Sequence, residues 1–474
     1  MAPHRGGPAA AAAALTDLRH VPFWLDGPVP RASPALAGAT TADLTVVGAG
    51  YTGLWTALLA KEADPGRDVV VLEAREAGWA ASGRNGGFCA ASLTHGLRNG
   101  VERFPDELSL LERLGRENLA EIELTLLRHG IACDWERTGE LTVATAPWQL
   151  EGLRDLPELA RRHGGEMQLL DATQVRELVD SPTYLGGVLD RTGVAMVDPA
   201  RLVRGLKEAC LRLGVRIFEH SPVDAVRDDG ASGLGLRTTY GTVSAPRVAL
   251  GTNAFPPLLR RLRGYLAPVY DYALVTEPLS ADQLASVGWR GREGLADAGN
   301  QFHYYRLTPD NRILWGGYDA VYHFGNRVDD RLDRNADTFA RLAEHFFTTF
   351  PQLLGLRFSH AWGGVIDTCS RFCVFWGRAY GGRLAYAAGY TGLGVGASRF
   401  GARVMLDLLE PGGRPTELTR LAMVRRKPLP FPPEPARWAG IALTRRAIAR
   451  ADRRGGRRGP WLRTLDRLGM GFDS

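Results

Sequence analysis

The stretch between residues 43 and 88 constrains the fold more than any other part of this chain. A short β-rich apolar run over residues 44–47 leads directly into three glycines, Gly48, Gly50 and Gly53, spaced G-x-G-x-x-G. In a dinucleotide-binding unit the first glycine makes the tight turn, the second lets a pyrophosphate approach the backbone, and the third brings helix and strand close together. The spacing therefore predicts a nucleotide-binding turn.

The residues that follow complete the same unit. Residues 54–61 have helical character, and a second apolar strand over 69–72 ends on Glu73, which comes 20 residues after the last glycine. The start of such a helix offers free N–H groups and a positive dipole end to phosphates, and Glu73 would accept hydrogen bonds from ribose hydroxyls. Because three glycines alone are weak evidence, a glycine-rich turn in some other α/β protein remains the alternative.

A second glycine-rich motif lies beyond the acid. Gly78 and residues 81–87 read G-x-x-A-S-G-R-N-G-G. With this motif the chain resembles the FAD-dependent amine and amino-acid oxidoreductases of the D-amino-acid-oxidase-like superfamily, and within it the γ-glutamylputrescine oxidoreductase-like branch. The resemblance covers most of residues 42–409. The alternative for residues 78–87 alone is a glycine-rich surface loop.

The resemblance implies a set of backbone contacts with FAD. Ser82, Asn85, Gly86 and Gly87 would line the flavin, and Val223 would hold the adenine through its backbone. Further contacts are expected where strands run into small-residue turns, at Gly251 and at a third glycine-rich segment. The expected cofactor-binding residues are Gly48, Gly50, Tyr51, Thr52, Gly53, Glu73, Ser82, Asn85, Gly86, Gly87, Val223, Gly251, Gly389, Gly392 and Gly394.

Three glycine turns separated by long insertions predict an α/β protein with a discontinuous Rossmann-like FAD-binding domain and an inserted α+β substrate domain. We assign 42–95, 194–265 and 378–424 to the FAD-binding domain and 96–193 and 266–377 to the substrate domain. Residues 1–41, rich in Pro, Ala and Gly, are expected to form a loose leader whose residues 23–25 dock an aromatic anchor. Helices are expected over 104–129, 200–213 and 397–409.

Aromatic residues are concentrated in the second insertion. Residues 305–306, 310 and 312–317 also carry the resemblance, in a Y-R-x-x-x-D-x-R-I-L-x-G-G run. An aromatic cage suits a cationic amine, because the face of an aromatic ring attracts an ammonium group. We expect His303, Tyr305, Arg306 and Trp315 to contact the substrate. Ordinary sheet packing is the alternative for each of these side chains.

The resemblance implies oxidation of a C–N bond in an amine or amino acid, with FAD accepting the hydride at N5 and the protein supplying orientation and electrostatics. Several relatives place a lysine near N5 for reaction with oxygen, but the only lysines here are Lys61, Lys207 and Lys427, none of them in the insertions. The electron acceptor therefore stays open between oxygen and another compound. Some relatives attach FAD through a cysteine; the loosely matching surroundings of Cys369 favour non-covalent FAD.

Composition limits the remaining alternatives. Five scattered cysteines form neither a disulfide framework nor a zinc spacing, and the absence of a secretory signal and of a long apolar run makes the cytoplasm the default location. Oxidation of a hydroxy acid or polyol on the same scaffold, and a non-catalytic nucleotide-binding role, stay open.

The positive charge of the chain is concentrated at its C-terminal end. The net charge of +6 belongs to residues 425–474, which hold 13 Lys and Arg against 4 Asp and Glu. This basic tail should form helices over 438–454 and 461–472, the second with Trp461, Leu465, Leu468 and Phe472 on one face. Two docked helices with a solvated basic loop are the plain interpretation. A peripheral membrane or protein contact is the alternative; no nucleic-acid-binding fold is evident.

Overall fold

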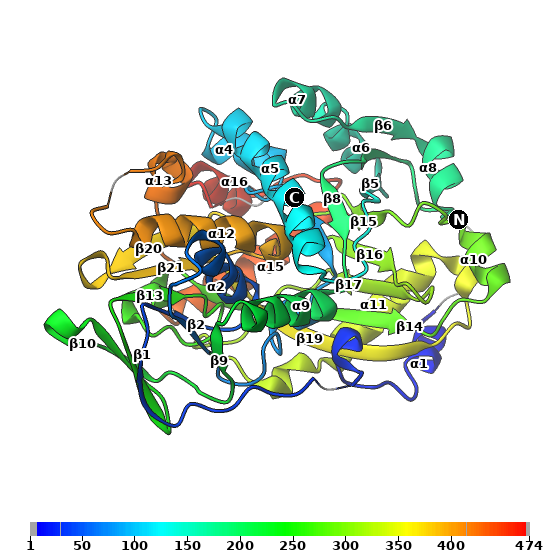
Figure 1. The fold of residues 1–474 in the computed structure, drawn as a ribbon. Coiled ribbons are helices and arrows are strands. Elements are labelled where there is room, and N and C mark those ends of the chain that lie inside the picture. The colour runs from blue at the N-terminus through cyan, green and yellow to red at the C-terminus, as the bar shows by residue number, and fades with distance from the viewer. Residues whose placement is uncertain (1–6, 29, 414, 471–474) are drawn as a thin grey trace.

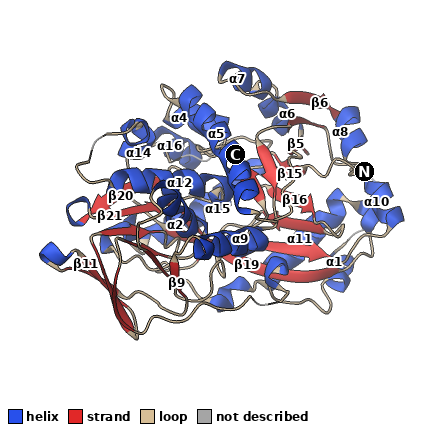
Figure 2. Ribbon diagram, viewed as in Figure 1, coloured by secondary structure: helices blue, strands red, loops and turns tan. Residues whose placement is uncertain are grey.

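The computed structural model describes residues 7–28, 30–413 and 415–470. The chain forms two main sheets, which lie side by side with helices around them (Figures 1 and 2). The first is a six-stranded sheet in the order β20 (Phe375–Ala379), β21 (Leu384–Ala388), β13 (Arg247–Leu250), β2 (Leu44–Val47), β3 (Val69–Leu72) and β9 (Arg216–Phe218). Its five strands from β21 to β9 run parallel, and β20 is antiparallel to β21.

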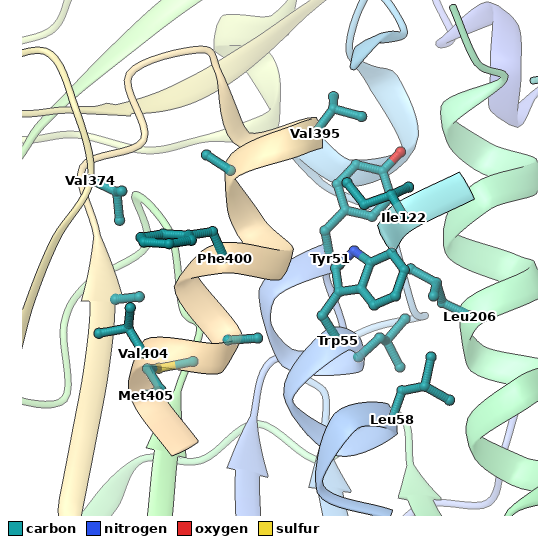
Figure 3. Close-up of a cluster of buried hydrophobic side chains, with 14 of the residues drawn as sticks. Tyr51, Trp55, Leu58, Ile122, Leu206, Val374, Val395, Phe400, Val404 and Met405 are labelled. Carbon is teal, nitrogen blue, oxygen red and sulfur yellow. The ribbon is translucent and has the colours of Figure 1, made fainter. Parts of the chain in front are cut away.

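Both faces of the six-stranded sheet are buried, because successive side chains of its strands point to opposite faces. On β2 and β3, Val46, Val69 and Val71 join one core cluster with the helices α2 (Tyr51–Ala63), α9 (Pro199–Arg212) and α12 (Gly394–Leu409). Figure 3 shows α2 and α12 adjacent in this cluster, with Phe400 of α12 pointing toward Val374. Because side chains of a strand point to opposite faces in turn, Val47, Val70 and Leu72 pack on the other side.

That other side is covered by a four-stranded sheet rather than by helices. Its order is β1 (Gly38–Thr41), β12 (Gly241–Ala245), β11 (Leu234–Arg237) and β10 (Ala225–Asp228). Strand β1 belongs to the leader and pairs parallel with β12. A two-stranded ribbon of β4 (Phe88–Ala90) and β8 (Val194–Met196) links the two halves of the molecule.

The second main sheet has nine strands and combines both insertions. Strands β5 (Glu140–Ala144), β6 (Gln168–Asp171) and β7 (Gly186–Asp190) come from the first insertion. The others are β14 (Ala267–Thr276), β15 (Gly294–Asp297), β16 (His303–Leu307), β17 (Ile313–Gly317), β18 (Val321–Tyr322) and β19 (Phe358–Thr368). The parallel pair β5–β15 joins the two groups. Helix α11 (Ala336–Thr349) buries Phe339, Leu342 and Phe346 in a core cluster together with residues of this sheet.

Further helices pack around the two sheets. They are α3 (Ala81–Arg84), α4 (Leu97–Arg103), α5 (Leu108–His129), α6 (Pro147–Leu153), α7 (Leu156–Arg162), α8 (Ala172–Leu178), α10 (Ala281–Val287), α13 (Glu417–Arg420) and α14 (Ala422–Arg425). The helix expected over 104–129 begins at Leu108, and the helix expected over 397–409 begins at Gly394, because the glycine turn itself starts the helix. Asp198 caps α9 by accepting a hydrogen bond from Arg201 N, as its N-cap position predicts.

The leader is packed against the body, which differs from the expectation of a loose segment. Helix α1 (Pro8–Ala14) buries Ala11 and Ala14 in the cluster that contains α11. Trp24, in the short 3-10 helix Phe23–Leu25, is buried, and its indole Nε1 donates to the carbonyl of Asn85. The aromatic anchor expected at residues 23–25 therefore holds the second glycine-rich loop.

The tail forms α15 (Ala436–Arg453) and α16 (Pro460–Arg467). Both expected tail helices are present; the second ends at Arg467, and Phe472 lies outside the described residues. Asp452 ties α15 to the substrate sheet by accepting hydrogen bonds from Asn300 N (3.3 Å), Asn300 Nδ2 (2.5 Å) and Gln301 N (3.1 Å). None of the helices within the described ranges has the length and apolar content to cross a membrane.

Candidate active site

A single large cavity of about 1480 Å³ runs between the six-stranded and nine-stranded sheets. This volume exceeds the roughly 300–1,000 Å³ typical of a small-molecule site, so it can hold a large cofactor together with a substrate. The predicted cofactor residues that line it are Gly48, Gly50, Tyr51, Thr52, Glu73, Ser82, Asn85, Gly86, Val223, Gly251, Gly392 and Gly394. Residues distant in sequence therefore meet at one surface.

The three remaining glycines of the predicted set, Gly53, Gly87 and Gly389, stand behind that surface. A Cβ on Gly53 would lie 1.8 Å from the carbonyl oxygen of Gly48, a distance no side chain tolerates. A Cβ on Gly87, whose φ is +79°, would lie 2.2 Å from Val197 O. Gly53 and Gly87 shape the turns because other backbone occupies the place of a side chain, whereas a Cβ on Gly389 would meet the Cys369 side chain at 2.9 Å.

The first turn is held by contacts that fit a pyrophosphate site. Gly48 has φ +101° and a missing Cβ that would lie 2.6 Å from Gly251 O, which brings the first and second segments together. Ser82 Oγ accepts a hydrogen bond of 2.9 Å from Tyr51 N, the first residue of α2. Bare backbone at a helix start is the form of site that binds phosphate groups.

Glu73 lies at the carboxyl end of β3 and is buried. Its Oε2 accepts from Ala49 N at 2.7 Å, and its Oε1 accepts from Arg75 N at 3.0 Å and from Trp79 Nε1 at 2.9 Å. Burial raises the pKa of Glu73, while these hydrogen bonds oppose the shift. The carboxylate is therefore fixed in orientation at the cavity wall, where lone pairs remain for a ribose.

The third segment is organised by a buried acid. Asp367 Oδ2 accepts a hydrogen bond of 2.6 Å from Gly389 N, and burial raises the pKa of Asp367 to about 7. Thr52 Oγ1 donates to Tyr390 OH at 3.0 Å and so links α2 to the same turn. The N-terminal residues Gly394 and Val395 of α12 line the cavity, which places a positive dipole end there.

The four residues expected to contact the substrate are placed behind the cavity wall. None of them is among the residues that line the cavity. Tyr305 and Trp315 belong to the core cluster beneath the sheet, where the Tyr305 hydroxyl hydrogen-bonds to Tyr184 OH at 2.8 Å. His303 is stacked between Trp315 and Tyr318, with ring centroids 4.8 and 5.2 Å away.

Arg306 supports the cofactor loop. Its Nη1 donates to Val197 O at 2.8 Å and to Gly87 O at 3.3 Å, and burial lowers its pKa to about 10. The guanidinium therefore fixes the backbone around Gly87 from behind. Its Nε also donates to Leu307 O at 3.2 Å, and the guanidinium lies over the Trp24 ring, 5.6 Å from the centroid.

The side chain of β16 that does face the cavity is Tyr304. Its ring occupies space that two glycines leave open, since a Cβ on Gly86 or on Gly316 would lie 2.7 or 2.6 Å from it. Its hydroxyl donates a hydrogen bond of 2.7 Å to Oδ2 of Asp271 on β14, which also lines the cavity. Burial raises the pKa of Asp271 to about 6, and the Tyr304 hydrogen bond partly offsets the shift. Sequence reasoning missed both residues.

The basic tail forms a further wall of the cavity. Residues of both tail helices line it, among them Ile441, Thr444, Ile448, Leu462 and Leu465. The Trp461 indole donates to Thr444 Oγ1 at 2.9 Å and joins α16 to α15. The tail is thus part of the site as well as a charged surface.

The cysteine thiols lie away from the cavity surface. The five cysteines are all buried, and burial raises the pKa of Cys369 to about 11. Cys369 is not among the cavity-lining residues, whereas its neighbours Thr368 and Ser370 are. No group of three or more His, Cys, Asp or Glu side chains in the described part of the chain could hold a metal ion.

Comparison with known proteins decides the family. The profile of the FAD dependent oxidoreductase (DAO) family matches residues 43–408. The chain belongs to this family. The resemblance read from the glycine motifs is therefore confirmed, as are FAD as cofactor and oxidoreductase as the class of enzyme.

Relatives extend over most of this flavoenzyme. Over 379 residues it is 35% identical to γ-glutamylputrescine oxidoreductase of Escherichia coli, covering 78% of this chain and 84% of that protein. It is 30% identical over 385 residues to the probable oxidoreductase OrdL of Haemophilus influenzae, covering 79% and 84%. Among solved structures, glycine oxidase from Geobacillus kaustophilus aligns with a TM-score of 0.65 at 20% identity, over 81% of this chain and 99% of that one.

The predicted fold class is confirmed by these structural neighbours. The residues present also fit FAD. Three glycine turns from separate segments leave bare backbone at one cavity, and Glu73 stands where the ribose of a dinucleotide would lie. The family profile ends at residue 408, before α15 and α16 begin, so it does not include the tail wall of the cavity.

Proposed function

We propose that this flavoenzyme oxidises the C–N bond of an amine or amino acid. The observation that carries the proposal is the Tyr304–Asp271 pair, because it places a carboxylate and an aromatic ring on the cavity wall beside the cofactor loop. A ring face and a carboxylate both attract an ammonium group. The relatives support this class, since γ-glutamylputrescine oxidoreductase and the sarcosine oxidase β subunit act on amines by name.

The proposed role of Asp271 is to accept a proton from the substrate. An amine enters as an ammonium ion, and its nitrogen lone pair is available to the reacting carbon only after that proton is lost. FAD, when bound, supplies the acceptor for the hydride equivalent. A carboxyl whose pKa is raised to about 6 is ionised at neutral pH and is a stronger base than an ordinary aspartate.

The chain also orients the substrate and excludes water. The Tyr304 hydroxyl fixes one oxygen of Asp271, and the ring of Trp362, whose indole donates to Arg84 O at 2.9 Å, lines the same region. The apolar residues Ile441, Ile448 and Leu462 of the tail would cover the substrate on its far side. An apolar enclosure of this kind disfavours the charged amine and so favours its loss of a proton.

We propose non-covalent attachment of FAD. The Cys369 thiol is buried, donates to Cys373 O at 3.2 Å, and lies behind Gly389, whose missing Cβ would be 2.9 Å from the sulfur. Denaturation of purified protein with acid should release all yellow colour into the supernatant. Colour that stays with the precipitated chain would overturn this part of the proposal.

The electron acceptor is proposed to be oxygen or a separate compound, with no lysine assisting. Lys61 donates to Pro65 O and Arg67 O, and Lys207 pairs with Glu219 at 2.8 Å. Neither residue lines the cavity, and neither does Lys427. The rate at which oxygen restores the colour of the reduced enzyme would separate the two kinds of acceptor.

A substrate panel tests the proposal. Purified holoenzyme is mixed anaerobically with γ-glutamylputrescine, other primary amines, sarcosine, amino acids and hydroxy acids, and the visible flavin band is followed. The expected result is bleaching by one or more amines or amino acids and none by hydroxy acids. Bleaching by a hydroxy acid alone would refute the proposal.

A further inference from the structure

The outward side of the tail hairpin is uniformly basic. Besides Arg445, which lines the cavity, seven arginines on α15, α16 and their connection are exposed: Arg446, Arg450, Arg453, Arg454, Arg457, Arg463 and Arg467. Within the described ranges, none of these seven forms an ion pair. We call this set the basic outer face. An unpaired row of like charges repels itself, so an anionic partner would stabilise it.

The acids of the described tail do not face outward with these arginines. Glu434 accepts hydrogen bonds from the Tyr322 hydroxyl and from Gly325 N. Asp452 accepts hydrogen bonds from Asn300 Nδ2 and Gln301 N, and Asp466 forms an ion pair with Arg458 at 2.6 Å. Because all three are satisfied by the body or by the hairpin itself, the charge on the basic outer face is not neutralised by neighbouring acids.

Large apolar side chains are exposed on the same hairpin. Trp438 is 47% exposed, Leu443 46% and Leu468 55%. Arginines alternating with exposed Trp and Leu are typical of helices that lie in the plane of a membrane surface, where the apolar groups enter the acyl boundary and the arginines meet headgroup phosphates. A nucleic acid backbone offers the phosphates but no apolar layer for these three side chains.

We propose that the basic outer face binds an anionic phospholipid bilayer and holds the enzyme at a membrane surface. The helical spacing separates this face from the cavity wall. On α15, Ile441, Thr444 and Ile448 line the cavity. Arg446 and Arg450 of the same helix and its C-cap Arg454, spaced four residues apart, lie on the exposed side. The bound membrane would therefore lie directly behind one wall of the active-site cavity.

Sedimentation of the full-length holoenzyme with vesicles tests the proposal. Binding is expected with vesicles that contain phosphatidylglycerol and phosphatidylcholine, with much weaker binding to phosphatidylcholine alone. Raising the salt concentration should weaken it, because exposed charges are screened. Absence of binding to the anionic vesicles at low salt would overturn the proposal.

Two triple variants test whether vesicle binding depends on the basic outer face or only on the net charge of the protein. The triple variant R446E/R450E/R454E should lower the vesicle affinity by about tenfold or more, since each basic residue near an anionic surface adds to binding. The matched control R154E/R227E/R260E makes the same charge change at exposed arginines outside the hairpin and should keep the affinity within about twofold. Equal losses in both variants would contradict the assignment. Flavin content, measured in each, verifies that the variants are folded.

A further substitution and a competing ligand distinguish lipid from other polyanions. Trp438→Ala leaves the charge unchanged and should weaken vesicle binding, because an apolar contact with the bilayer is lost. Tight binding of duplex DNA at the salt concentration at which vesicles fail to bind would show that the partner is a nucleic acid and would refute the membrane proposal.

Discussion

The Tyr304 hydroxyl donates a 2.7 Å hydrogen bond to Oδ2 of Asp271, and both residues line the cavity beside the loop that contains Gly86. The two residues come from β16 and β14, which are not neighbours in the sheet; β17 lies between them and presents Gly316 at the point where the Tyr304 ring crosses it. A glycine on the middle strand thus permits a contact between its two flanking strands.

The pH dependence of this pair is the first prediction. Burial raises the pKa of Asp271 to about 6, so a step that needs the ionised carboxylate should gain rate as the pH rises through about 6. The Tyr304 hydroxyl lowers that pKa, so Tyr304→Phe should raise it and move the acid limb of kcat/KM to higher pH. Tyr305→Phe is the control, because its hydroxyl bonds to Tyr184 in the core and should leave the limb in place. If the acid limb of kcat/KM does not move in Tyr304→Phe, the ionisation of Asp271 does not determine that limb.

The first glycine turn leads to a prediction on cofactor loading. Gly53→Ala would put a methyl group 1.8 Å from Gly48 O, which the turn cannot accept without moving. The variant should therefore purify with little or no FAD, as read from the ratio of flavin to protein absorbance. Gly27→Ala, where nothing lies within 4 Å of the added carbon, should retain full loading.

Glu73 should contribute to FAD affinity. In Glu73→Gln, the amide NH₂ group would face either Ala49 N or the pair Arg75 N and Trp79 Nε1, all of which now donate to carboxylate oxygens. Loss of about 1–3 kcal/mol would raise the FAD dissociation constant roughly 5- to 150-fold. Titration of apoprotein with FAD measures it, with the exposed Glu76→Gln as control. Unchanged affinity in Glu73→Gln would show that this carboxylate has no part in holding the dinucleotide.

The tail wall predicts an effect on substrate binding. Asp452→Ala removes three hydrogen bonds to residues 300 and 301, each worth about 0.5–1.5 kcal/mol, and should loosen α15 over the cavity. The expected result is a KM raised several-fold and faster proteolysis after residue 435, with flavin content unchanged. Asp466→Ala breaks only the Arg458 pair inside the hairpin and should have a smaller effect. Equal KM values in the two variants would argue against a tail wall.

The cofactor site was predictable from the sequence because backbone close to backbone demands glycine. At Gly48 the carbonyl of Gly251 from another segment occupies the place of a Cβ, and at Gly53 the carbonyl of Gly48 from the same turn does, so no other residue fits and the requirement is visible as a spacing. In the motif around Ser82 and Asn85, Gly87 meets the same requirement, since a Cβ there would lie 2.2 Å from Val197 O. Residues of all three segments line the cavity.

The substrate side could not be placed with equal precision. His303, Tyr304 and Tyr305 follow one another on β16, so the sequence does not say which face of the strand meets the cavity, and a shift by one residue exchanges the two faces. The expectation therefore included His303 and Tyr305, which do not line the cavity, while Tyr304 does. Arg306 is two residues from Tyr304, but its guanidinium contacts the backbone of Gly87 and Val197. A signal for the cavity-facing side was available in Gly316, which pairs with Tyr304 and leaves space for its ring.

Long-range docking was the least predictable feature. The contact of Asp452 with Asn300 joins residues 152 positions apart, and nothing local in the tail marks that partner. In the leader, burial of Ala11 and Ala14 against α11 depends on alanine, which is equally common in loose segments. The sequence therefore predicted helices in the tail and an aromatic anchor in the leader, but it did not predict where either segment packs on the rest of the protein.

The most direct test of the account compares wild-type holoenzyme with Asp271→Asn during anaerobic mixing with the amine that bleaches the flavin. At pH 8 the wild type should bleach rapidly, and Asp271→Asn, with its FAD still bound, should bleach about 10²- to 10⁴-fold more slowly, the range expected for loss of a general base. Equal bleaching rates in the two proteins, or no bleaching of the wild type by any amine or amino acid, would contradict the proposed chemistry.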